Sequence, residues 1–393
     1  MNIDKPKLLW QLTCEGAWPS AVAFLGSGRR IAAANQEGQM YVWDLPEAPP
    51  AFEPAKGSDR QAPDQAPVRR LDGHTNGVTR LVATTDGKQL VSASLDHTVR
   101  VWLPEGPAAG TADAVLDLEQ RQKAAKRDKK PELLTAPGVT VETLTAAHVL
   151  EGHTDWVLAL GLSADQQRLI SGDVRSQVIV WDLAGRKELS RWSGLPHNWI
   201  QAAALAPDGQ TAVVSEYRYK RDDFDCPAPA LRVYDAAGQV KLDILKTMFP
   251  KYNPEATSYD SKQIWSKFIS AGLLAADISP DGKLVALAQG GETDTGKVHV
   301  VEIETGKLLR DVSGHMSGAT DVKFSADGKL LLSTGRDTTL RICQVEDGME
   351  VAALNSPRGG QFKDWLSSLA ISPDQKTVAA TDIAGRILIW SLA

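Results

Sequence analysis

Residues 151–183 read EGHTDWVLALGLSADQQRLISGDVRSQVIVWDL, and this stretch decides the fold class. A Gly-His pair leads into an alternating apolar run, and a short polar turn at 163–167 joins that run to a second one. A third apolar run follows and ends in Trp-Asp. Apolar runs that alternate with polar residues on both sides of such a turn are typical of a β-hairpin. The stretch therefore predicts three consecutive antiparallel strands.

The same pattern recurs along the whole chain. The turn returns as ATTDGKQ, LSADQQR, LAPDGQT, ISPDGKL, FSADGKL and ISPDQKT, with FLGSGRR as a weaker seventh copy. About fifteen residues after each turn comes the third run, as MYVWDL, VRVWLP, VIVWDL, LRVYDA, HVVEIE, LRICQV and ILIWSL. Self-similarity at a fixed period indicates a repeat architecture. The hairpins are predicted to start near residues 18, 77, 156, 199, 272, 318 and 365.

Over nearly its whole length the chain resembles the WD40-repeat β-propellers. The residues that carry the resemblance are the Gly-His pairs at 73–74, 152–153 and 314–315 and the Trp-Asp pairs at 43–44 and 181–182. The resemblance implies an all-β fold, a single seven-bladed WD40 propeller of four-stranded antiparallel blades. It further suggests a stand-alone WD40 protein of the bacterial type.

In that family a hydrogen-bonded His–Ser/Thr–Asp–Trp set stabilises a blade. The resemblance implies the whole set in blade two, as His74, Ser92, Asp96 and Trp102. Blade three has Arg175 where the Asp is expected, and blade six has Cys343 where the Trp is expected. His153, His197 and His315 occupy the same place as His74, before the first strand of a blade.

The two ends of the chain are predicted to close the ring together. The last repeat ends at Trp390-Ser391-Leu392, which leaves no room for an outer strand. The segment LLWQL, residues 8–12, precedes the first hairpin and can take that place. Pairing of the two ends would remove the exposed sheet edges of an open array.

The irregular segments divide between the two faces of such a propeller. Residues 46–67, rich in Pro and Ala, and residues 105–146 are expected on the bottom face, the first as a flexible loop. Within the second, residues 113–130 favour a helix, which is either a solvated excursion or an arm that docks on something. Residues 215–230 and 245–272 are expected on the top face. They hold four of the six tyrosines, so we expect a packed cap over blades four and five rather than a spacer.

One position just before the first strand carries an unexpected residue in four of seven blades. It is Trp in four blades, whereas Gly77 and Gly318 stand at the same place in others. By the resemblance this position lies on the top face, near the mouth of the central channel. A Trp there offers a large contact area at low entropic cost, which favours a binding surface, although each Trp can instead cover the neighbouring blade. The partner-binding residues we expect are Trp18, Trp156, Trp199, Trp365, Trp265, Tyr217, Arg218, Tyr219, Arg221 and Tyr252.

The partner class is less constrained. Arg218, Lys220 and Arg221 favour a partner with an acidic or phosphorylated segment. Alternatively this triplet is a solvated loop balanced by the aspartates at 222, 223 and 225. The net charge of −6 argues against a nucleic-acid partner or binding to an anionic membrane.

Composition also indicates the compartment. The three cysteines are widely spaced and odd in number, which fits a reducing cytosol. The start lacks the apolar core of a signal peptide, and no apolar run reaches the length of a membrane span. The simplest interpretation is a cytoplasmic protein, although a chain from which a leader had been removed would look the same.

No familiar catalytic motif is present. The sequence contains no His-x-x-x-His, Cys-x-x-Cys, phosphate loop or Gly-x-Ser-x-Gly, so we expect no catalytic residues, no metal and no cofactor. The predicted function is a non-enzymatic scaffold, a monomeric platform within a complex, that presents an aromatic top face to partner proteins. The alternative is a propeller enzyme or small-ligand binder that uses the central channel.

Overall fold

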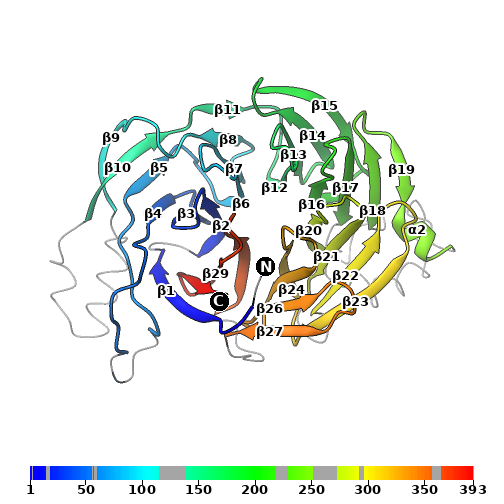
Figure 1. The fold of residues 1–393 in the computed structure, drawn as a ribbon. Coiled ribbons are helices and arrows are strands. Elements are labelled where there is room, and N and C mark those ends of the chain that lie inside the picture. Colours follow the sequence, from blue (N-terminus) through cyan, green and yellow to red (C-terminus); the bar gives the residue numbers. More distant parts are fainter. Residues whose placement is uncertain are drawn as a thin grey trace, which may run out of the picture.

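The chain forms a closed ring of seven β-sheets around a central channel (Figure 1). The structure, a computed structural model, describes residues 1, 3–14, 18–54, 56, 60–114, 139–217, 229–250, 272–291, 296–355 and 364–392. Within these residues there is one helix, α2 (Ile244–Met248), and otherwise strand and turn. The predicted fold class, a seven-bladed propeller of four-stranded antiparallel blades, is confirmed.

In every blade the first strand lines the channel and the fourth lies at the rim (Figure 1). Blade one consists of β2 (Pro19–Leu25), β3 (Arg30–Asn35), β4 (Met40–Asp44) and β5 (Arg69–Asp72). Blade two consists of β6 (Val78–Ala83), β7 (Leu90–Ser94), β8 (Val99–Trp102) and β11 (His148–Leu150). Blade three consists of β12 (Val157–Leu162), β13 (Arg168–Asp173), β14 (Gln177–Asp182) and β15 (Lys187–Ser193).

The second half of the ring follows the same order. Blade four consists of β16 (Trp199–Leu205), β17 (Thr211–Tyr217), β18 (Ala230–Asp235) and β19 (Val240–Asp243). Blade five consists of β20 (Leu273–Ile278), β21 (Leu284–Gln289), β22 (Gly296–Glu302) and β23 (Leu308–His315). Blade six consists of β24 (Ala319–Phe324), β25 (Leu330–Gly335), β26 (Leu340–Gln344) and β27 (Glu350–Leu354). We call the end of the ring where the first strands begin the top face, and the end that carries the hairpin turns after them the bottom face.

Blade seven joins the two ends of the chain. It consists of β28 (Leu366–Ile371), β29 (Thr377–Asp382), β30 (Arg386–Ser391) and β1 (Lys7–Thr13), in that order, and β1 pairs antiparallel with β30. Trp10 and Leu12 of β1 are 2% and 0% exposed. The prediction that the N-terminal segment supplies the missing outer strand is confirmed. The pairing is favourable because the backbone N–H and C=O groups at the outer edge of β30 would otherwise have no partner strand.

Hydroxyl groups on the first strands link consecutive blades around the channel. Thr79 Oγ1 donates to Val157 O at 2.6 Å and Thr320 Oγ1 donates to Leu366 O at 2.7 Å. The closing link runs from Ser367 Oγ to Pro19 O at 2.9 Å and joins blade seven to blade one. The ring is therefore closed by backbone and side-chain hydrogen bonds on its inner wall as well as by β1 at its rim.

The insertion of blade one is held against β1 over residues 60–65, which differs from the flexible loop expected for 46–67. Gln11 N donates to Pro63 O at 3.0 Å, and Gln61 N donates to the Gln11 side chain at 2.8 Å. Thr13 Oγ1 donates to Asp64 Oδ2 at 2.6 Å. Composition predicted mobility because the segment has few apolar residues, but polar contacts to a strand far along the chain were not visible in the sequence.

The insertion of blade two adds two strands to blade one. β9 (Gly110–Ala114) pairs with β10 (Val139–Thr145), and β10 lies parallel to β5. Leu144 of β10 is 3% exposed, and Arg69 Nη2 lies 2.9 Å from Glu142 Oε2. Both ends of the 105–146 segment thus dock on a neighbouring blade of the same chain. The helix predicted at 113–130 lies outside the described residues from position 115 onwards.

The core is divided into clusters between adjacent blades. One cluster, between blades seven and one, contains Trp10, Phe24, Tyr41, Trp43 and Ile389. The cap predicted over blades four and five lies largely outside the described residues. In its described part, α2 buries Ile244 and Leu245 in the cluster between these two blades.

Candidate functional site

A buried chain of hydrogen bonds holds the top of blade two. Trp102 Nε1 donates to Ser92 Oγ at 2.8 Å, and Ser92 Oγ lies 2.6 Å from His74 Nε2. His74 Nδ1 lies 2.7 Å from Asp96 Oδ2, which also accepts from Thr75 N at 3.1 Å. Burial lowers the pKa of His74, although Asp96 opposes that change. A neutral His74 fits the chain, because Nε2 then accepts from Ser92 while Nδ1–H donates to Asp96.

Blade three has the same chain with a different acid. His153 Nδ1 lies 2.8 Å from Asp173 Oδ2, His153 Nε2 lies 2.7 Å from Ser171 Oγ, and Trp181 donates to Ser171. Arg175, which occupies the expected position of the acid, instead points outward with 71% of its side chain exposed. Asp173 follows Ser171 by two residues rather than four, so position-by-position comparison missed it. The presence of Asp173 near Arg175 could have indicated that another residue supplies the acid.

Blades six and four have different buried hydrogen-bond networks at the top face. In blade six, His315 contacts Ser333 at 2.8 Å and Asp337 at 3.0 Å, while burial raises the pKa of the Cys343 thiol to about 11. Blade four does not use its histidine, because His197 is exposed. The buried Glu216 takes over the top of this blade: Tyr234 Oη donates to it at 2.7 Å and Leu195 N donates to it at 2.5 Å. These buried networks fix the loops that lead into the first strands and so hold the top face in place.

The residue before each first strand has the same backbone role in several blades. Its carbonyl accepts a backbone N–H from the turn between the second and third strands, at Trp18 (3.2 Å), Gly77 (2.8 Å), Trp156 (3.1 Å), Gly318 (2.9 Å) and Trp365 (3.0 Å). The equivalence predicted between these Trp and Gly positions is therefore structural and not only a matter of sequence spacing.

The glycines have a steric reason that the sequence argument did not contain. A Cβ at Gly77 would lie 2.6 Å from Gln36 O, and one at Gly318 would lie 2.4 Å from Gly291 O. In these blades the turn of the preceding blade occupies the space that the Trp side chain takes elsewhere. Glycine at 77 and 318 therefore does not show that the tryptophans are dispensable for packing.

Gly77→Ala is expected to lower the free energy of unfolding by about 1–3 kcal/mol, because the added methyl group meets a backbone oxygen that side-chain rotation cannot move. The matched control is Gly110→Ala in β9, where a Cβ would meet only Thr143 Oγ1 at 3.4 Å. Denaturant titration of both variants measures the difference. Equal loss in the two, or none in Gly77→Ala, would contradict the steric explanation.

The four tryptophans are unequally exposed. Trp18 and Trp156 are 55% and 44% exposed, whereas Trp199 and Trp365 are half-buried. The Arg336 guanidinium carbon lies 4.7 Å from the centroid of the Trp365 ring. Of the other expected partner-binding residues, Tyr217 is buried at 2% exposure in the cluster between blades four and five, so it does not belong to the surface proposed below. The remainder lie outside the described residues, namely Trp265, Arg218, Tyr219, Arg221 and Tyr252.

The channel contains a chamber at the top face. It has a volume of about 420 Å³, and Trp18, Trp365, Arg80 and Arg336 line it. Arg80 of blade two reaches across the channel, where its Nη2 donates to Leu274 O of blade five at 2.7 Å. Because these blades lie on opposite sides of the ring, Arg80 forms a strut below the top chamber.

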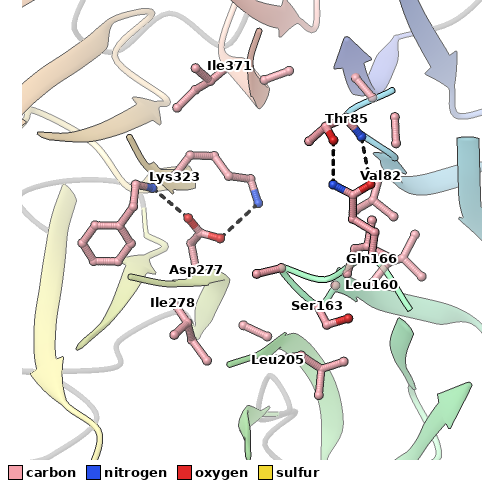
Figure 2. Close-up of a pocket in the computed structure, with 18 of the residues that line it drawn as sticks. Val82, Thr85, Leu160, Ser163, Gln166, Leu205, Asp277, Ile278, Lys323 and Ile371 are labelled. Carbon is pink, nitrogen blue, oxygen red and sulfur yellow. Dashed lines mark hydrogen bonds and ion pairs between the residues drawn. The ribbon is translucent and has the colours of Figure 1, made fainter. Parts of the chain in front are cut away.

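A second chamber, of about 510 Å³, opens among the hairpin turns at the bottom face (Figure 2). Asp277 and Lys323 project into it from adjacent blades, with Lys323 Nζ 3.8 Å from Asp277 Oδ1. Phe324 N donates to Asp277 Oδ2 at 2.7 Å and so orients the carboxylate. Burial raises the pKa of Asp277, an effect that the Lys323 ammonium partly offsets.

The described residues contain no group of three or more His, Cys, Asp or Glu side chains placed to hold a metal ion. In the same part of the chain, no helix is long and apolar enough to cross a membrane.

Known proteins match the chain both in short repeats and along its length. Residues 65–102, 144–182 and 306–343 match the WD40 family, described as "WD domain, G-beta repeat". Actin-interacting protein 1 of Drosophila melanogaster is 23% identical over 95% of this chain and 60% of its own length. Autophagy-related protein 16 of Arabidopsis thaliana is 34% identical over 25% of this chain and 19% of its own length.

A third relative is the target of rapamycin complex subunit LST8 of Saccharomyces cerevisiae, 32% identical over 21% of this chain and 23% of its own length. The chain thus spans at most 60% of the length of these three relatives. Three matched repeats lie within a ring of seven four-stranded blades. The chain is a WD40-repeat β-propeller.

Proposed function

We propose that this propeller is a non-enzymatic platform that binds partner proteins through the aromatic surface around Trp18 and Trp156 on its top face. The observation that carries the proposal is exposure: among the aromatic side chains of the described residues, these two alone are exposed. Exposed tryptophan is costly in water and is enriched at sites where proteins bind one another. The half-buried Trp199 and Trp365 extend the same surface. Two relatives, an actin-interacting protein and a subunit of a complex, have names that describe association with other proteins.

Rigid presentation supports the same function. The buried His–Ser–Asp chains of blades two, three and six tie the top-face loops to the strands beneath them. A partner that docks on such a surface loses little free energy to reorganisation of the platform. We infer that the propeller acts as a monomeric platform within a complex.

The partner we propose carries an acidic segment, and Arg80 is the residue that would receive it. Arg80 crosses the channel at the base of the top chamber, whose described lining residues include no carboxylate. Its guanidinium bonds to two neutral acceptors, Leu274 O and Thr79 O. A carboxylate or phosphate would make stronger, charge-assisted hydrogen bonds to the same group. Arg218, Lys220 and Arg221 favour an acidic partner from the sequence alone, so Arg80 is an independent reason for it.

We propose a cytoplasmic location and protein partners on the basis of composition. Cys14 and Cys343 are buried and lie far apart in the sequence, in keeping with a reducing cytoplasm. The net charge of −6 favours protein partners over nucleic acid or anionic membrane. That the chain is of the stand-alone bacterial type stays a prediction.

A photo-crosslinking amino acid at position 18 or 156 is expected to capture partner proteins, because those side chains face the proposed surface. Position 349 is the matched control: Met349 is 64% exposed in the turn just before β27, the rim strand of blade six, away from the top face. Trp18→Ala/Trp156→Ala is expected to lose the same proteins in a quantitative pull-down, while Met349→Ala/Val351→Ala retains them. Arg80→Gln is expected to weaken their binding and to reduce its salt dependence.

Two results would count against the platform, and a third would count only against its acidic partner. Equal capture at 18, 156 and 349 would mean that the surface is not specific. Retention of every protein by the double Trp variant would mean that the two side chains cover the blades only. An unchanged salt dependence in Arg80→Gln would remove the acidic segment while leaving the aromatic surface in place.

A further inference from the structure

We propose that the bottom chamber of the channel binds a small zwitterion, of the class of the apolar α-amino acids, between Asp277 and Lys323. This site is separate from the top face, because the Arg80 strut lies between the two chambers. It does not depend on the proposed platform function.

The wall of the chamber is charged on one side only. Asp277 and Lys323 each lie four residues after the first residue of their strands, β20 and β24. At the same place in three other blades the chamber is lined by Ala23, Gly161 and Ala370, and in blade four it is lined by Ala203 and Ala204, four and five residues after the first residue of β16. These small residues leave open space opposite the charged pair, and a group bound to the pair would extend into that space.

The pair is accessible and incompletely bonded. Asp277 and Lys323 keep 27% and 37% of their side-chain surface exposed although both lie inside the ring. Their 3.8 Å separation is longer than a hydrogen bond. Among the described residues, Lys323 Nζ has the ion pair with Asp277 but no hydrogen bond, so the ammonium can still donate to a ligand or to water. The carboxylate, by contrast, is already oriented by the N–H of Phe324.

Charge selects a zwitterion over a simple ion. An anion beside Lys323 would be repelled by Asp277, and a cation beside Asp277 would be repelled by Lys323. The nearby Arg80 and Asp321 also have opposite charges; Arg80 is bound to carbonyl groups and Asp321 accepts from Leu369 N at 2.8 Å. The surroundings therefore sum to zero charge. A neutral molecule with an ammonium on Asp277 and a carboxylate on Lys323 satisfies both residues without leaving an uncompensated charge in the channel.

The rest of the chamber fits an apolar body. Leu160, Leu205, Ile278 and Ile371 lie around the pair in Figure 2. The nearest polar side chain on the opposite side, Gln166, is already bonded to Thr85 N at 3.1 Å and Thr85 Oγ1 at 2.8 Å. The volume of 510 Å³ lies within the range of small-molecule sites, about 300–1,000 Å³.

Calorimetric titration of the full chain tests the proposal with three matched probes. L-Valine carries both charges, 3-methylbutanoate lacks the ammonium and 2-methylpropylamine lacks the carboxylate. We expect saturable binding of L-valine, or of leucine, methionine or phenylalanine in the same assay, and at least about tenfold weaker binding of the two single-charge probes. Failure of all four amino acids to bind would overturn the proposal. Equal binding of either single-charge probe would overturn it too.

Substitutions of the two charged residues test whether the amino acid binds between them. Asp277→Asn and Lys323→Gln are each expected to weaken amino-acid binding by about tenfold or more, and Lys376→Gln, an exposed lysine on the bottom face, is the control. Unchanged affinity in both channel variants would mean that the amino acid binds elsewhere. If a channel variant fails to fold, the probe series on the unmodified protein still decides, because it separates a two-charge site from non-specific binding.

Discussion

Deletion of residues 1–13 is expected to lower the melting temperature by about 10 °C or more, or to leave the protein aggregated. The deletion removes β1, whose Trp10 and Leu12 are almost fully buried. Burial of two such side chains contributes about 3–6 kcal/mol, a large share of a typical folding free energy of about 5–15 kcal/mol. The deletion also exposes β30 as a sheet edge and removes the strand to which residues 60–65 are bound.

Two companion experiments separate closure from general truncation. Deletion of residues 1–6 retains β1 and removes the terminal ion pair with Asp327, the partly buried Met1 and Ile3 and the bond from Asp4 N to Leu392 O, so a smaller loss of stability than for the longer deletion is expected. A synthetic peptide of residues 7–14, added to the longer deletion, is expected to restore part of the melting temperature by pairing with β30. If both deletions melt like the full chain, β1 does not close the ring.

Asp173→Ala is expected to lower the free energy of unfolding by about 3–5 kcal/mol, while Arg175→Ala changes it by less than about 1 kcal/mol. Asp173 is fully buried, and its carboxylate accepts from His153, from Arg175 N at 2.8 Å and from Gln177 N at 3.0 Å. The alanine variant leaves the buried His153 Nδ1 and two part-buried backbone N–H groups without this acceptor. Arg175 forms only an exposed ion pair with Asp155.

Denaturant titration of the two variants decides which residue is the acid of blade three. The sequence comparison placed Arg175 at that position. A large loss in Arg175→Ala with little change in Asp173→Ala would reverse the structural assignment. Asp173→Asn serves as a milder variant if the alanine variant does not fold, since it retains an acceptor oxygen and loses the charge.

Features whose residues lie within one repeat were predictable from the sequence. Each hairpin turn and third strand is encoded within about thirty residues, as in 151–183, and alternation of apolar residues is enough to predict them. The four residues of the blade-two chain also lie within one repeat. The missing outer strand of blade seven was predictable because seven hairpins leave one vacancy and the N-terminus one spare strand.

By itself, therefore, the sequence determined the number of blades, their order, the closing strand and the position of the top-face tryptophans, because each depends on local patterning or on counting. The tertiary structure decided the rest. It pairs β10 with β5, brings Gln36 against Gly77, sets Lys323 beside Asp277 and carries Arg80 to Leu274, 194 residues away. These contacts join different blades. Their geometry is set by closure of the ring, which no single repeat encodes.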